Sequence, residues 1–154
     1  HTIGDIKFIF RSQVETNDAI SDPRVSYQYG DFPKEDLFKE GDVLLFPHKF
    51  DGLSLPIQEA MSAGMPIITT DIYPHNTYLP QEFLFEADGF GRARMGARYR
   101  EFEMAFISSK TLAQKIEQFA GQDITELSRK MNELAEEWSW TNLKDKYLEV
   151  INNL

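Results

Sequence analysis

Cysteine is absent from the 154-residue sequence, so disulfide bonds and thiolate metal sites are excluded and a reducing compartment is the natural setting. No apolar run approaches the roughly 18 residues that a transmembrane helix needs, and no secretory signal pattern is present. Histidine is scarce, and His1, His48 and His75 lack the i, i+4 spacing of a helical metal pair. These absences predict a cytoplasmic protein without a bound metal.

Positive charge is also in short supply. The 25 acidic and 16 basic residues leave a net charge of −9, which argues against nucleic acid as a partner. The basic residues concentrate at one place, where four arginines stand close together: Arg92, Arg94, Arg98 and Arg100. Charge runs of this kind usually mark a solvated loop, and we favour that interpretation over contact with an anionic acceptor or a lipid surface.

Length and hydrophobic content are those of one domain. A chain of 154 residues with 42% hydrophobic side chains can bury a single core. The sequence begins with His1 rather than methionine, so we expect residues 1–154 to be one domain of a larger protein whose upstream part is missing.

Short apolar runs alternate with segments of helical character. β-rich runs predict strands, and amphipathic spacing or a closing glycine predicts helices. Strands are expected at residues 6–10, 25–29, 42–46 and 66–70, and helices at 36–40, 56–63, 109–119, 124–138 and from a Thr141 cap to 151. This order predicts an α/β fold, a parallel sheet flanked by helices with a helical C-terminal segment.

Segment 81–107 is harder to interpret. Residues 83–85 and 104–107 have strand character on either side of a glycine- and arginine-rich loop. In the C-terminal part, the rings of Trp138, Trp140 and Tyr147 are expected to pack in the core or at an interface between domains.

Residues 46–61 carry the strongest indication of function. A nearly all-apolar strand ends, a loop containing Gly52 follows, and a helix begins. Ligands of open α/β sheets bind at the carboxyl ends of strands, and the amides of a helix N-terminus attract anions such as diphosphate. Asp51 and Glu59 bracket this turn. From the residues alone this is a candidate phosphate loop, in which Asp51 can equally be a turn residue and Glu59 a solvated helix residue.

The same block resembles the retaining GT-B glycosyltransferases of family 4, also called group 1. Their signature is two acidic residues separated by seven positions in a glycine-containing loop, followed by a helix that reads Glu-Ala-Met. Asp51 and Glu59 form that pair here, and residues 65–71 are similar to the strand that follows. Weaker similarity extends the resemblance over about residues 5–80 and 109–152.

The resemblance implies the nucleotide-sugar-binding domain of a two-domain GT-B enzyme, Rossmann-like and lacking its first strand–helix unit. Such enzymes transfer a sugar from a nucleotide-diphosphate donor with retained anomeric configuration. A glycan or lipid-linked acceptor, bound by the missing N-terminal domain, would fit polysaccharide biosynthesis and peripheral association with the inner face of the membrane. No cofactor and no metal are implied, because amides and basic side chains neutralise the diphosphate. The isolated domain is expected to be inactive.

The resemblance also implies roles for individual residues. The implied donor-binding residues are Asp51, Gly52, Leu53, Ser54, Leu55 and Glu59. Glu59 would bind the ribose hydroxyls, Asp51 would lie near the sugar hydroxyls, and the four amides between them would meet the sugar and diphosphate. The residues expected near the base or on the pocket rim are Gly30, Asp31, Phe32 and His48. No catalytic nucleophile is assigned.

Several positions depart from the family pattern. Asp51 is one methylene shorter than the usual glutamate, Ser54 stands where glycine is frequent and would narrow the loop, and residues 72–75 replace a usual glycine pair. The phosphate-clamping Arg and Lys of the family would fall before residue 1. Two alternatives therefore stay open, a non-catalytic GT-B-like binding module and a nucleotide-sugar epimerase.

Overall fold

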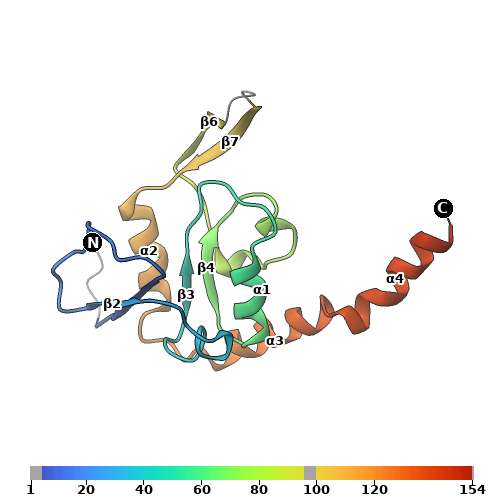
Figure 1. Ribbon diagram of the computed structural model, residues 1–154, viewed down its shortest axis with the longest axis horizontal. Helices are drawn as coiled ribbons and strands as arrows, with labels where there is room; N and C mark the ends of the chain where they lie inside the picture. Colours follow the sequence, from blue (N-terminus) through green and yellow to red (C-terminus); the bar gives the residue numbers. More distant parts are fainter. Residues whose placement is uncertain (1–4, 96–99, 154) are drawn as a thin grey trace.

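Two parallel sheets form the body of the protein in a computed structural model that describes residues 5–95 and 100–153 (Figure 1). The first sheet pairs β1 (Phe8–Ser12) with β2 (Val25–Tyr29). The second contains β3 (Leu44–Phe46), β4 (Ile67–Thr70) and β5 (Leu84–Phe85), in that order. With the helices that flank them, these sheets confirm the predicted α/β fold with a helical C-terminal segment.

β4 is the buried centre of the three-stranded sheet. All four of its residues are buried, as expected for a strand with neighbours on both edges and side chains covered on both faces. Its isoleucines extend the apolar interior, whereas Thr69 and Thr70 place hydroxyl groups at its carboxyl end. The carboxyl end of β4 therefore carries buried polar side chains, whereas its first half is apolar.

The hydrophobic core lies between β4 and two helices, α1 (Leu55–Ser62) and α3 (Thr125–Glu137). Ile57 and Met61 of α1 and Met131 of α3 are almost fully buried in it.

The turn after α1 depends on Gly64, whose φ of 68° is in the left-handed region. A Cβ at this position would stand 2.8 Å from the end of the Asn132 side chain, which would have to move, so the conformation above all favours glycine.

The glycine- and arginine-rich segment is a β-hairpin, and the predicted loop is wrong for most of it. β6 (Gly89–Met95) pairs antiparallel with β7 (Arg100–Phe106), and the hairpin projects from the body (Figure 1). Arg92 and Arg94 lie 3.4 and 2.9 Å from carboxylate oxygens of Glu101. These cross-strand charge pairs favour a ladder where composition indicated a loop. Arg98 lies outside the described residues.

The C-terminal helices follow in sequence, α2 (Ser109–Phe119), α3 and α4 (Trp140–Asn152). The predicted Thr141 cap is wrong, because Ser139 Oγ accepts the hydrogen bond of the Asn142 amide. α4 extends away from the body (Figure 1), and Trp140 is 66% exposed. Trp138 and Tyr147 are also exposed, so these rings do not belong to the core of this chain.

Shorter elements connect the main ones. The helix predicted at 36–40 is replaced by a 3-10 turn, η1 (Lys34–Asp36), and two further turns, η2 (His75–Thr77) and η3 (Gln81–Phe83), follow β4. Among the described residues, none of the helices combines the length and apolarity needed to cross a membrane.

Candidate functional site

The candidate site lies at the carboxyl ends of β3 and β4. These strands are parallel neighbours, with Phe46 opposite Thr69, so the loops that leave them open at the same edge of the sheet. Residues 47–54 connect β3 to α1, and residues 71–75 leave β4. The sheet topology therefore brings two loops and a helix N-terminus together, where open α/β sheets bind ligands.

Asp51 is bound on both of its carboxylate oxygens. Oδ1 accepts a hydrogen bond from the Gly52 amide at 2.7 Å, and Oδ2 accepts one from the Ser54 hydroxyl. Oδ2 also lies 2.8 Å from His48 Nδ1 and 3.1 Å from His75 Nε2. Four groups thus converge on one carboxylate, which fixes the loop in front of α1.

The two histidines reach Asp51 from segments that follow different strands, His48 after β3 and His75 after β4. His75 is fully buried, and its Nδ1 is 3.2 Å from Thr69 Oγ1, which itself donates to the Phe46 carbonyl oxygen at 2.8 Å. His48 packs edge-on against the Phe46 ring, with 4.0 Å between ring centroids. The centroids of the two imidazole rings are 6.0 Å apart.

The ionisation of this cluster is set by burial and by its own hydrogen bonds. Burial raises the pKa of Asp51, but the hydrogen bonds from Ser54 and Gly52 and the neighbouring His48 outweigh it and hold the pKa below its usual value. Burial lowers the pKa of His48, despite the opposing attraction of Asp51. The carboxylate is therefore kept ionised, and His48 is biased toward its neutral form.

The loop between Asp51 and α1 presents free backbone amides. The N–H groups of Leu53, Ser54 and Leu55 have no acceptor among the described residues, whereas that of Gly52 is donated to Asp51. Ser54 is 4% exposed, with its hydroxyl directed to Asp51 rather than to the helix end. Its side chain is therefore buried against Asp51 rather than directed into solvent.

Glu59 lies on a different side of α1. With Leu55 and Gln58 it lines an open groove of about 590 Å³, whose opposite wall is formed by Glu35, Phe38 and Lys39. Its carboxylate makes no hydrogen bond or ion pair with any described residue. The groove begins at Leu55, the residue that carries the last free amide, and Glu59 stands one helical turn further along.

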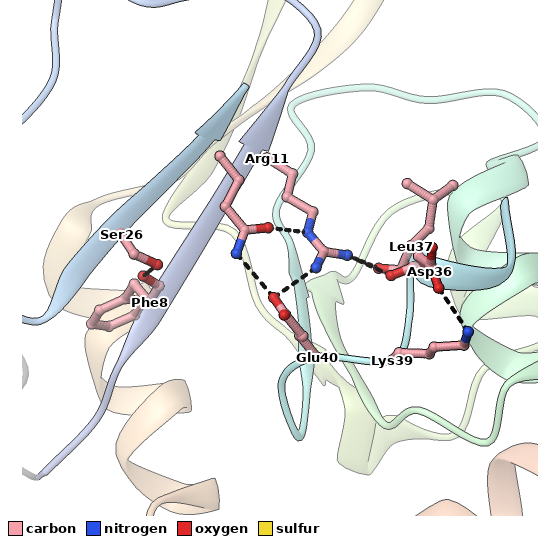
Figure 2. A network of polar contacts seen from close by, with 8 residues as sticks. Phe8, Arg11, Ser26, Asp36, Leu37, Lys39 and Glu40 are labelled. Atoms are coloured by element: carbon pink, nitrogen blue, oxygen red, sulfur yellow. Dashed lines mark hydrogen bonds and ion pairs between the residues drawn. The ribbon is translucent and has the colours of Figure 1, made fainter. Parts of the chain in front are cut away.

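Arg11 holds the outer wall of this groove in place, a role that the sequence analysis missed. Figure 2 shows its guanidinium reaching from β1 to the end of η1, where it donates to the carbonyl oxygens of Asp36 and Leu37 at 2.8 and 2.7 Å. It also pairs with Glu40 at 2.8 Å and donates to Gln28. The signal was an arginine that directly follows the apolar residues Phe8–Phe10.

The residues expected near the base follow β2. Gly30 has a φ of 117°, which lets the chain turn toward η1. Asp31 is exposed and accepts a hydrogen bond from Gln13, and the Phe32 ring stacks under the Arg11 guanidinium at 5.1 Å. The segment that carries them leads directly into the groove wall at Glu35.

The β6–β7 hairpin is attached to the same loop. The Ala105 amide donates to the Lys49 carbonyl oxygen at 2.7 Å, and the Phe50 and Phe102 rings are 4.5 Å apart. The hairpin base therefore supports the loop that contains Asp51.

Comparison with known proteins identifies the family. The family model described as "Glycosyl transferases group 1" matches residues 13–89, half of the chain, and this range includes the Asp51 cluster and the Glu59 groove. The chain matches no curated protein and no solved structure. With the parallel sheets and the loop–helix unit at their carboxyl edge, this match shows that the chain belongs to the group 1 glycosyltransferases.

Proposed function

We propose that this domain binds the nucleotide-diphosphate sugar of a glycosyl transfer reaction. The observation that carries the proposal is the unpaired Glu59 carboxylate in a groove that begins at the free amides before α1. A helix N-terminus attracts the diphosphate through its N–H groups and its partial positive charge. A carboxylate one turn away can accept hydrogen bonds from two ribose hydroxyls.

We infer how the donor would lie from the residues that line the groove. The diphosphate meets the amides of Leu53, Ser54 and Leu55, the ribose meets Glu59, and the base extends toward the wall that follows Phe32. The sugar then lies on the side of Asp51, whose Oδ1 already accepts the Gly52 amide. Asp51 thus acts chiefly by positioning the loop, with any remaining lone pair directed to a sugar hydroxyl.

Transfer itself needs groups beyond this site. A second domain would supply the acceptor, a glycan or a lipid-linked sugar, and would close the cleft over the donor sugar. Retention of anomeric configuration and a hexosyl donor are implied by the resemblance of the Asp51–Glu59 motif to the family pattern. Cytoplasmic location, with attachment to the inner face of the membrane, suits an enzyme of polysaccharide biosynthesis.

Calorimetric titration with uridine and guanosine diphosphates tests the donor site. Glu59→Ala should weaken the binding of the preferred nucleotide at least about tenfold, since each hydrogen bond to a charged group contributes roughly 1.5–3 kcal/mol. Gln58→Ala is the matched control, because Gln58 lines the same groove one position away. If Glu59→Ala binds the nucleotide as tightly as the parent chain, the ribose assignment is wrong.

A further inference from the structure

His48, Asp51 and His75 form a group of three metal-ligand side chains at the carboxyl edge of the sheet. Among the described residues, their ligand atoms all lie within 4.8 Å of one another. They come from two loops that meet only in the folded protein, since His48 and Asp51 follow β3 and His75 follows β4. The absence of helical i, i+4 spacing, which predicted a chain without metal, does not apply to ligands on different strands.

Counting hydrogens for a neutral imidazole at His75 leaves two acceptor atoms facing each other in the cluster. The single hydroxyl hydrogen of Thr69 is donated to the Phe46 carbonyl oxygen at 2.8 Å, so His75 Nδ1, 3.2 Å from the same hydroxyl, must be the donor to it. The other nitrogen of a neutral imidazole then carries no hydrogen. In this neutral form, His75 Nε2 points a lone pair at Asp51 Oδ2, an acceptor 3.1 Å away.

His48 shows the same deficiency independently. Its Nδ1 atom is buried and makes no hydrogen bond of normal geometry with any described residue, although it lies 2.8 Å from Asp51 Oδ2. Two imidazole nitrogens and a carboxylate oxygen thus face one another at short range. A cation among them would satisfy all three atoms at once.

The geometry suits a small divalent metal ion. Tetrahedral Zn²⁺ with bonds of 2.0–2.2 Å sets its ligand atoms about 3.4 Å apart. The two distances from the histidine nitrogens to Asp51 Oδ2, 2.8 and 3.1 Å, would have to lengthen only slightly, and all three ligand atoms lie within 4.8 Å of one another. The Thr69 hydroxyl holds the non-ligating nitrogen of His75, as outer hydrogen bonds do for metal-bound histidine. His48 and Asp51 are partly exposed, which leaves a fourth coordination position for water.

We propose that His48 Nδ1, Asp51 Oδ2 and His75 Nε2 bind a zinc-type divalent cation. The ion joins the loop before α1 to the segment after β4, and so stiffens the loop that carries the free amides of Leu53, Ser54 and Leu55. Imidazole and carboxylate ligands favour first-row metals such as Zn²⁺ over Mg²⁺ or Ca²⁺, which prefer oxygen ligands. The site goes beyond the proposed function and does not depend on it.

Titration of the metal-free 154-residue chain with ZnCl₂, followed by calorimetry, tests the proposal, with Co²⁺ absorption reporting a tetrahedral site. One ion should bind per chain. His48→Gln should weaken binding at least about tenfold, and Thr69→Val, which removes the outer hydrogen bond to His75 together with the one to the Phe46 carbonyl oxygen, by roughly 10–100-fold. His75→Gln should lose the site as well, with circular dichroism to check that this buried substitution leaves the fold intact.

Two control variants test whether the ion binds at this cluster or elsewhere on the chain. Glu59→Ala should bind Zn²⁺ like the parent chain, because Glu59 lies in the groove and outside the cluster, so nucleotide and metal binding fail independently. His1→Ala should also bind normally, and loss of binding in that variant would assign the ion to the chain terminus. Absence of binding at millimolar Zn²⁺, or equal affinity in His48→Gln and the parent, would overturn the proposal.

Discussion

Asp51 and Glu59 belong to one sequence motif, yet they lie in opposite surroundings. Asp51 is 20% exposed, and four groups of the chain approach its two oxygens. Glu59 lines an open groove and pairs with no described residue. A carboxylate whose hydrogen bonds are satisfied internally stabilises structure, whereas an unsatisfied one beside a cavity is available to a ligand. The pair therefore divides into a carboxylate held within the chain and one left open to the groove, which is the residue we propose to bind the donor.

The largest expected difference is in stability. Asp51→Ala leaves the buried Ser54 hydroxyl without its acceptor and removes the partner of both histidines, which should lower the free energy of unfolding by roughly 1–3 kcal/mol. Glu59→Ala should change it by less than about 0.5 kcal/mol. Urea denaturation of the three proteins measures both values. Equal stability of the two variants would remove the distinction between the two acids.

A charge placed at the start of α1 probes the groove without touching the Asp51 cluster. Leu55 is 68% exposed, so Leu55→Glu removes few packing contacts. A negative charge in the first turn of a helix leaves the stability of the fold unchanged or raises it slightly. The same charge repels a diphosphate and should weaken nucleotide binding about fivefold, or ~1 kcal/mol, with a smaller effect at high salt. Leu55→Gln is the neutral control. Unchanged affinity in Leu55→Glu would place the phosphates elsewhere.

The smallest expected effect is a pH dependence confined to the Asp51 cluster. Because burial lowers the pKa of His48 in the folded chain, the unfolded chain binds that proton at a higher pH. As the pH falls below the usual histidine value of about 6.5, the unfolded state holds more protons, and the free energy of unfolding decreases until the lower folded pKa is passed.

Denaturation of the EDTA-treated protein between about pH 7.5 and about pH 5.5 measures this dependence. His48→Gln should show a flatter profile than the parent chain, while Glu59→Ala should follow the parent. A profile that is equally steep in His48→Gln would assign the dependence to other groups.

Local sequence signals predicted some elements to the residue. The strand at 25–29 and the helix at 109–119 have the predicted bounds, because β-branched and aromatic alternation in the first and a serine cap with amphipathic spacing in the second act over neighbouring residues. β1 begins two residues later than predicted, since its limits are set by pairing with β2. β6 was missed because its stability comes from partners on β7 rather than from its own composition.

The candidate site likewise has a part that local sequence signals predicted and a part that depends on long-range contacts. The loop and helix of residues 51–59 were predicted because glycine, proline and the acidic pair stand within one continuous stretch. Nothing within that stretch indicates that Asp51 is enclosed by His48 and His75, or that Arg11 supports the groove from β1. These contacts join residues up to 29 positions apart, as between Arg11 and Glu40.

The sequence by itself therefore determined the family, the α/β class and the position of the loop–helix unit, because those depend on contiguous motifs and on the spacing of apolar residues. Only the tertiary structure decided which acid of the pair is free and which is held. The physical reason is that parallel pairing of β3 and β4 places the carboxyl ends of both strands at one edge of the sheet. The hydrogen-bond partners of a carboxylate at that edge are therefore side chains that are distant in the sequence and become neighbours only in the folded chain.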